Sequence, residues 1–329
     1  MDNVKDNSIT DIVPADNIDS ELFEVNYSVP VKQSLAYLPT LFTTASLPLR
    51  NVKKTVFTRK GSNGITLKLT SPLNVPYGLY GRLLLSVLTT HAVLAKNQEG
   101  LVCIEYAKLG DLLKEMQLPK TRGLDVKTQL ECFSNATFSF SQKVSELQSG
   151  YLFEDLYEDG NYPKKDVVVT THSTGNIRFT EGVQYKDIDD GSTEKRCFGF
   201  KIVLSPEFSN FCKKHAVPIN YTVYKELKSS VGKDIYAWLI YRNHSIKKPT
   251  FIPRHKLVEQ FMPADDAKNK YQENTNYSRI IEQIKEIKEK YYPDLNIEID
   301  SKGSGITLRK SPEQIKGNDI RYALITSDI

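Results

Sequence analysis

The sequence lacks the residues from which most metal sites, disulfide frameworks and membrane segments are built. Only four cysteines occur in 329 residues, Cys103, Cys132, Cys197 and Cys212, and none forms a C-x-x-C pair. This spacing encodes neither a zinc knuckle nor a disulfide scaffold, so we interpret the four as small buried hydrophobic side chains in a reducing compartment. No apolar run approaches the ~20 residues that a bilayer requires, and the N-terminus lacks the features of a secretion signal. We therefore expect a cytoplasmic protein.

Signatures of catalysis are also missing. Gly232-Lys233 is followed by Asp234 and has no upstream glycine of a P-loop, so we expect no ATP site. The five histidines form no His-hydrophobe-His metal pair, and neither G-x-S-x-G nor H-E-x-x-H occurs. We expect no catalytic residue, no metal and no cofactor. A nicking enzyme that uses one of the tyrosines is an alternative, although a tyrosine requires an activating partner.

Charge is unevenly distributed along the chain. The net charge is +4, but residues 1–50 contain three basic and seven acidic side chains, whereas residues 201–329 contain 22 basic and 16 acidic ones. An acidic arm ahead of a basic C-terminal part suits a protein whose C-terminal domain binds a polyanion.

Composition and length suggest two domains flanked by terminal segments. The chain is longer than a single core usually serves, and its first residues are rich in Asp, Asn and Ser. We predict a disordered acidic arm over 1–45, an N-terminal domain over 46–205, a C-terminal domain over 206–315 and a tail over 316–329.

The predicted N-terminal domain begins with a hairpin in 53–72, where apolar residues alternate around Gly61-Ser62-Asn63-Gly64. A helix follows over about 78–94, then helical segments at 108–118 and 124–136 that are separated by the break 119–123. Strand patterns follow the second of these. A helix-turn-helix followed by strands indicates a winged helix, with 151–166 as a mobile loop inserted in its wing.

The C-terminal third repeats this order of elements. We predict helices from about Lys233, in 251–261 and in 276–290, followed by a hairpin in 295–312. Asn276 or Thr275 would cap the third helix and Pro293 would end it. The fold class is therefore α+β, with two winged-helix domains. Residues 60–72 and 302–312 also look alike, which leaves a duplication open.

Three motifs resemble a known family. They are VPYGLYGRLLL at 75–85, SSVGKDIYAWLIYR at 229–242 and LVEQF at 257–261, in an order that is similar to plasmid-encoded RepA replication initiators. Met262 and 231–233 depart from the family pattern. Trp238, Tyr236 and Leu239 are most simply core residues. Arg82 and Arg242 are candidates for phosphate contacts or for buried ion pairs, for example with Asp234.

The C-terminal domain offers the principal DNA-binding candidates. The second helix of a helix-turn-helix enters the major groove with its N-terminal residues against the bases. These residues are Asn276, Tyr277, Ser278 and Arg279, of which Arg279 suits guanine and Asn276 adenine. Backbone contacts are predicted from the preceding loop, Lys268, Asn269, Lys270 and Tyr271, and from the wing, Lys302, Arg309 and Lys310. We interpret Glu282, Lys285, Glu286 and Lys290 as a solvated helix face.

The corresponding helix of the N-terminal domain is less basic. Its candidates are Lys120, Thr121, Arg122, Lys127 and Gln129, whereas Asp125 and Glu131 reduce the positive field. The resemblance implies that this domain also serves self-association as a homodimer.

The resemblance implies a protein that binds repeated origin sequences in double-stranded plasmid DNA and recruits host replication proteins, such as a helicase and its loader. A transcriptional regulator with the same surfaces and no initiation role is the first alternative. A structural protein that uses its winged helices for protein contacts is another, which weak and salt-insensitive DNA binding would favour.

Overall fold

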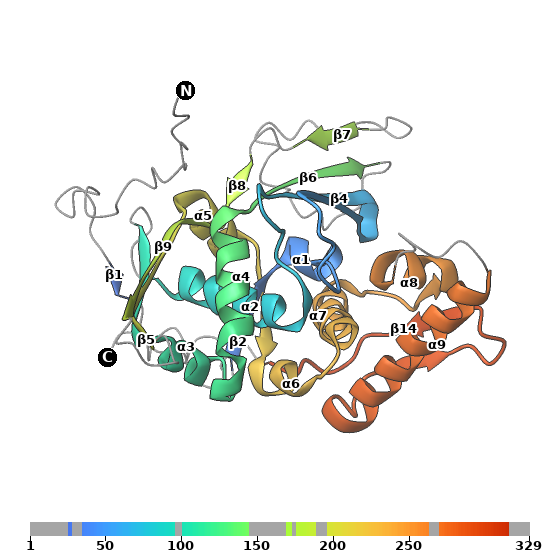
Figure 1. Cartoon of the computed structure of the whole chain (residues 1–329). Helices are drawn as coiled ribbons and strands as arrows, with labels where there is room; N and C mark the ends of the chain where they lie inside the picture. Colours follow the sequence, from blue (N-terminus) through green and yellow to red (C-terminus); the bar gives the residue numbers. More distant parts are fainter. Residues whose placement is uncertain are drawn as a thin grey trace.

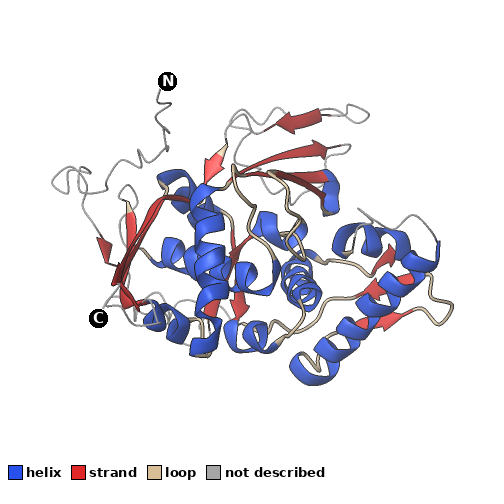
Figure 2. Cartoon of the chain, viewed as in Figure 1, coloured by secondary structure: helices blue, strands red, loops and turns tan. Residues whose placement is uncertain are grey.

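The computed structural model describes residues 26–27, 35–95, 101–144, 169–172, 176–188, 196–262 and 270–315, and it has the mixed helix and sheet content that the sequence predicts (Figures 1 and 2). The helices are α1 Thr40–Thr44, α2 Gly78–Leu94, α3 Leu109–Glu115, α4 Gly123–Asn135, α5 Pro206–Lys214, α6 Tyr221–Glu226, α7 Ser230–Ser245, α8 Arg254–Phe261 and α9 Lys270–Glu286. The strands are β1 Asn26–Tyr27, β2 Leu35–Pro39, β3 Val56–Lys60, β4 Ile65–Thr70, β5 Val102–Lys108, β6 Thr137–Val144, β7 Val169–His172, β8 Ile177–Arg178, β9 Thr180–Ile188, β10 Arg196–Leu204, β11 Ala216–Asn220, β12 Thr250–Pro253, β13 Ile297–Ile299 and β14 Gly305–Leu308.

The same succession of elements occurs twice. The first unit follows the order α2, β5, α3, α4, β9, β10, with β6 to β8 inserted before β9, and the second follows α7, β12, α8, α9, β13, β14. In each unit the last strand lies in the middle and pairs antiparallel with the other two, giving the orders β5-β10-β9 and β12-β14-β13. The repeated order of helices and hairpin is therefore confirmed.

The local sequence likeness between 60–72 and 302–312 does not reflect this repeat. Residues 65–70 form β4, which pairs with β3 and β6 in a separate sheet, whereas β14 is the central strand of the second unit. The strand equivalent to β14 is β10. The two Lys-Gly-Ser turns therefore belong to different parts of the fold, and this likeness is no sign of duplication.

A separate sheet of order β3-β4-β6-β7, with β8 beside β6, lies above α1 in Figure 1. Its inner face contributes Phe138 to an aromatic cluster, where the ring of Phe138 lies 5.4 Å from Phe42 and 4.9 Å from Phe179. Helix α5 adds Phe208 and Phe211 to the same cluster. These contacts join α1, the sheet and α5 in one hydrophobic core.

The predicted disordered arm over 1–45 includes residues that are folded in the structure. Residues 35–45, which we assigned to the arm, form β2 and α1, and most of their side chains are buried. β2 pairs antiparallel with β11. The boundary was misplaced because the apolar residues Leu35 to Leu38 and Leu41 to Phe42 were grouped with the polar residues that open the chain.

Helix α7 forms much of the core of the second unit. Trp238, Tyr236 and Leu239 are all buried, and the Trp238 ring lies 5.2 Å from that of Phe261 in α8. The side chain of Ser229 caps the helix by accepting a hydrogen bond from the Gly232 N–H. These motif residues therefore belong to the core of the fold. Cys103, Cys132 and Cys212 are buried free thiols, as expected, while the side chain of Cys197 lies outside the described residues.

Candidate nucleic-acid interface

Helix α9 separates an apolar face from an exposed polar face. Tyr277, Ile280, Ile284 and Ile287 are buried at the three- to four-residue spacing of one helix face. The opposite face exposes Asn274, Ser278, Arg279, Glu282 and Lys285. A π-helical turn, Ile287–Tyr291, completes the helix just before Pro293. Arg279 lies in the N-terminal half of this exposed face, three positions before the exposed Glu282.

Two residues predicted to contact bases are buried. We expected a helix start near Asn276, but α9 begins at Lys270, so Asn276 lies in its second turn. The Asn276 amide donates to the Met262 carbonyl at 3.2 Å and its oxygen accepts from Gln272 at 2.9 Å. Asn276 therefore neither caps the helix nor faces a groove. Tyr277 is buried as well, and the earlier helix start accounts for both corrections.

Tyr277 instead connects the helix to the hairpin β13–β14. Its hydroxyl donates to the Gly305 carbonyl at 3.2 Å, and the guanidinium of Arg254 lies 4.7 Å from the centre of its ring. Arg254 also donates to the Asn274 side chain, lies 3.7 Å from the Glu273 carboxylate, and its backbone N–H donates to Ser304. Arg254 thus holds α8, α9 and the hairpin turn together. Sequence reasoning missed this residue because its partners lie 19 or more positions away.

The turn of the hairpin is fixed by Asp300. Its carboxylate accepts hydrogen bonds from the backbone N–H groups of Ser304 and Lys302 and from the Ser304 hydroxyl. These bonds, that of the Ser304 N–H first, hold the pKa of Asp300 below its ordinary value. Gly303 adopts a φ of 70°, which favours glycine. The exposed Lys302 side chain therefore extends from a rigid turn.

The other two predicted wing cations have partners within the protein. Arg309 lies 3.3 Å from the Glu298 carboxylate across the hairpin. Lys310 donates to the Asn243 carbonyl of α7 at 2.9 Å and lies 3.4 Å from Glu313. Both remain partly exposed, but their charge is shared with these neighbours. Lys302 is thus the wing cation best placed for an external anion.

The C-terminal half of α9 faces an acidic groove against the hairpin. The groove is lined by Tyr277, Ser278, Ile281, Glu282, Lys285, Glu286, Glu289, Lys290, Ile299, Asp300, Ser301 and Gly303. Lys290 pairs with Glu286 at 3.1 Å one turn away. Carboxylates outnumber cations here, so phosphate is repelled and the interpretation of this half as a solvated face is supported.

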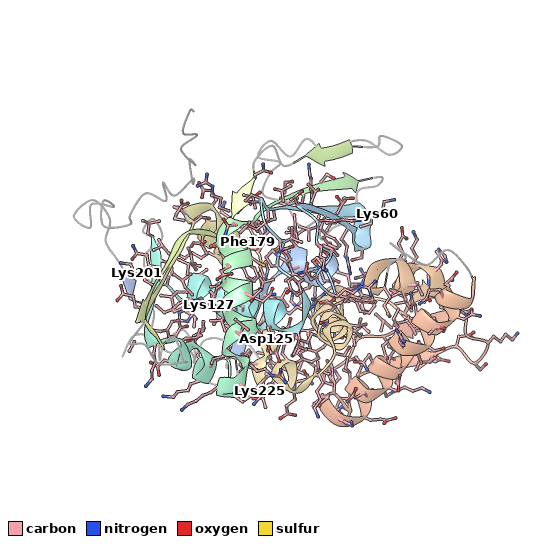
Figure 3. All side chains as sticks on the ribbon, in the orientation of Figure 1. Lys60, Asp125, Lys127, Phe179, Lys201 and Lys225 are labelled. Atoms are coloured by element: carbon pink, nitrogen blue, oxygen red, sulfur yellow. The ribbon has the colours of Figure 1, made fainter. Side chains whose placement is uncertain are left out.

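The corresponding turn of the first unit exposes its cations. Lys120, Thr121 and Arg122 form an exposed 3₁₀ turn before α4, although Arg122 lies 3.5 Å from Asp125 and its guanidinium 5.8 Å from the Tyr80 ring centre. Lys127 is half-buried on α4, two positions after Asp125, and Figure 3 labels both residues.

Gln129, by contrast, is not available to DNA. It is buried, and its side-chain oxygen accepts from the Tyr77 backbone N–H at 2.9 Å. The amide therefore fixes the start of α2 against α4, and its polar character in the sequence reflected this internal hydrogen bond rather than an exposed site.

The loop before α9 lies partly outside the described residues. This applies to Lys268 and Asn269, and for Lys270 and Tyr271 only the backbone, in the first turn of α9, is described. Ser278 lies beside the hairpin turn that carries Lys302, since Ser278 and Gly303 line the same groove. Arg279 and Asn274, of which the sequence did not single out Asn274, are exposed on the same half of α9.

Part of the chain is similar to a known protein family. Residues 169–251 match the family of the plasmid encoded RepA protein. The matched segment runs from β7 into β12 and therefore contains α7 with its Asp-x-Tyr-x-Trp motif. The resemblance seen in the sequence is thus confirmed over this segment, while 75–85 and 257–261 lie outside it.

Two solved structures are similar to the chain, and both contain domains 2 and 3 of RctB. The first has a TM-score of 0.47 and 13% identity and covers 84% of this chain and 99% of that chain. The second has a TM-score of 0.44 and 11% identity and covers 80% and 92%. No curated protein matches the sequence.

Among the described residues, no three or more His, Cys, Asp or Glu side chains are grouped so that they could bind a metal ion. No helix in those ranges is long and apolar enough to cross a bilayer.

Proposed function

We propose that the protein is a plasmid replication initiator whose second unit binds duplex DNA as a winged helix. In this proposal α9 is the recognition helix and β13–β14 is the wing. The order helix, strand, helix, helix, strand, strand supports it, since this order places the second helix of a helix-turn-helix beside a hairpin. The match to plasmid encoded RepA proteins supports the initiator role.

The observation that carries the proposal is the exposed N-terminal half of α9. Asn274, Ser278 and Arg279 lie on the face opposite the buried isoleucines, where a major groove would meet them. The guanidinium of Arg279 suits bidentate contact with guanine, and the two smaller side chains suit hydrogen bonds to bases or phosphate. Lys302 would contact the backbone from the wing.

The first unit is proposed to contact DNA or a second copy of the chain. Lys120, Thr121 and Lys127 favour phosphate, whereas Leu124, at the start of α4, is 78% exposed and favours a protein contact. We propose two units that meet near residue 206, with β2, α1 and α5 packed on the first. Recruitment of host replication proteins and binding of repeated origin sequences belong to this proposal by resemblance.

The test is a titration of the full chain against DNA flanking its own gene and against a scrambled duplex of equal composition. We expect selective binding that weakens steeply with salt. The fragment of flanking DNA that the protein binds preferentially is the selected sequence. Arg279→Ala should weaken binding to it by about 1 to 3 kcal/mol and leave binding to the scramble nearly unchanged. Lys290→Ala, on the same helix but paired with Glu286, is the matched control and should preserve selectivity.

A transcriptional regulator is the second candidate, because the same helix and wing would serve it. The selected fragment should support autonomous replication of a plasmid when the protein is supplied in trans. Repression of a promoter on that fragment without any replication would favour the regulator. Equal losses on both duplexes for Arg279→Ala would show that Arg279 does not read bases.

A further inference from the structure

Apart from Val56, the outer face of the separate sheet carries hydroxyl and ammonium groups. Because side chains alternate along a strand, the face opposite the aromatic cluster is formed by Val56, Thr58 and Lys60 of β3, Thr66, Lys68 and Thr70 of β4, and Thr137, Ser139 and Ser141 of β6. In the observed register Lys68 lies between Thr58 and Ser139 on the neighbouring strands. Both Lys60 and Lys68 are exposed.

No carboxylate is present on these strands. β3, β4, β6, β7 and β8 contain no aspartate or glutamate in their described residues. The sequence from Val25 to Gln98 contains none either, although 40 of the 329 residues of the chain are acidic. A sheet face with ammonium groups and no carboxylate has a positive potential and attracts anions.

The segment that leads into β3 adds to this charge. Lys53 and Lys54 are both exposed, and the Lys53 backbone N–H donates to the Asn51 side chain at 2.8 Å. Lys53 has a φ of 51°, so the chain turns sharply here before it enters the sheet. Four exposed lysines therefore lie within 16 positions of the chain, on one turn and two paired strands.

The sheet is fixed to the second unit through α8. Arg59, buried on β3, donates to the Gln260 carbonyl at 3.4 Å, and the Gln260 amide donates to the Thr44 carbonyl at 3.4 Å. Figure 1 shows the sheet beside α8, which precedes α9, and Figure 3 labels Lys60 at the edge that faces this helix. The basic face and α9 therefore lie on parts of the protein that are packed together through α8.

We propose that this sheet face binds the phosphodiester backbone of duplex DNA outside the segment that α9 reads. Lysine, serine and threonine side chains are typical donors to phosphate oxygens. The described outward residues include no aromatic side chain on which an unpaired base could stack, which favours a duplex over a single strand. The choice of DNA as the ligand rests on the proposed function, whereas the surface itself and its residues are separate from α9.

The experiment uses the full chain with Lys60→Gln and Lys68→Gln combined. Both side chains are exposed, so the melting temperature should not change. On a random duplex, the slope of log K against log salt concentration should fall by about 2, since each phosphate contact contributes about 0.9. Adding flanking base pairs to a short selected duplex should strengthen binding by the unaltered protein but not by the variant. Selectivity over the scramble should be preserved.

Lys214→Gln combined with Lys228→Gln removes the same charge from exposed positions elsewhere and serves as the control. It should retain both the salt slope and the gain from flanking DNA. A Lys60 and Lys68 variant that behaves like this control would overturn the proposal, as would a loss confined to a single-stranded oligonucleotide. If neither the unaltered protein nor the variants distinguish the selected duplex from the scramble, the proposed function fails. The difference in salt slope between the two double variants still shows whether the sheet face contacts phosphate.

Discussion

Arg82 and Asp234 form a two-pronged ion pair in the core, where α2 of the first unit meets α7 of the second. The Nε–Oδ1 distance is 2.7 Å and the Nη2–Oδ2 distance is 2.8 Å, and the side chains are only 2% and 5% exposed. Arg82 also donates to the carbonyls of Leu47, Pro48 and Gly78, and Asp234 accepts from the Ser46 hydroxyl. The first helices of the two units are thereby joined by charge-assisted hydrogen bonds.

Removing either partner should destabilise the protein strongly. Asp234→Asn leaves a buried guanidinium without its counter-charge, and Arg82→Met leaves a buried carboxylate, so each should lower the free energy of unfolding by about 3 to 5 kcal/mol. The double variant should lose less than the sum of the two single losses, because no uncompensated charge remains. Urea denaturation of the four proteins measures this coupling. Strictly additive losses would contradict it.

The sequence indicated that a buried ion pair was one role for these residues, but suggested Arg242 as a partner of Asp234. Arg242 is eight positions from Asp234, whereas Arg82 is 152 positions away. Local spacing cannot reveal a pairing at that distance. By contrast, the order of elements was predictable, because the apolar periodicity of α2, α4 and α7 is contained within each segment.

Lys233 should make stability depend on pH in the alkaline range. The side chain is fully buried, and its ammonium group donates to the carbonyls of Tyr224 and Lys225 at the end of α6. Burial, followed by the nearby charge of Arg82, lowers the pKa of Lys233 to about 7, against about 10.4 in an unfolded chain. Between these values the unfolded chain binds more protons, so the free energy of unfolding rises with pH, by up to about 1.4 kcal/mol per unit.

This contribution is measurable as a difference between proteins. The destabilisation caused by burying the Lys233 charge is fully present below pH 7 and disappears above about pH 10.4. Lys233→Met removes the titrating group, so the stability of the unaltered protein relative to this variant should rise between pH 7.5 and 9.5. Lys228→Met, at an exposed position nearby, should show no such trend. Parallel pH profiles for the Lys233 variant and the unaltered protein would refute the prediction.

Gly305 should tolerate no larger side chain, because β14 approaches β12 closely at this point. A Cβ atom there would lie 2.2 Å from the Ile252 carbonyl oxygen and 2.8 Å from the Phe251 ring. Gly305→Ala should therefore cost about 1 to 3 kcal/mol through overpacking and displace the hairpin from Tyr277. Thermal denaturation and the DNA titration together test this.

Gly182→Ala is the matched control for Gly305, because a Cβ atom at Gly182 would meet nothing within 4 Å. It should leave the melting temperature and the affinity for the selected duplex almost unchanged. Equal effects of the two substitutions would mean that loss of glycine flexibility, rather than the close approach of β14 to β12, governs stability.

The candidate interface was predictable only in part. Arg279 and Ser278 are exposed as the sequence predicted, because apolar periodicity identifies which face of α9 is buried. The start of the helix was misplaced, since most residues from Lys270 to Thr275 are polar and continue the composition of the loop before them. Asn276 and Gln129 were misjudged for a common reason. Their amides are satisfied by partners within the protein, and amino-acid type alone does not distinguish an internal hydrogen bond from a base contact.

Lys302 and Arg309 should differ in their effects on salt dependence, although both are cations of the same hairpin. Lys302 is exposed on a turn that Asp300 fixes, whereas the guanidinium of Arg309 lies 3.3 Å from Glu298. Lys302→Ala should weaken binding to the selected and scrambled duplexes alike and reduce the slope of log K against log salt by about 0.9, as loss of one phosphate contact requires.

Arg309→Ala should change the slope less, because its charge is already balanced within the protein. Titrations at several salt concentrations provide both values, and a larger slope change for Arg309 than for Lys302 would place the phosphate at the other end of the hairpin.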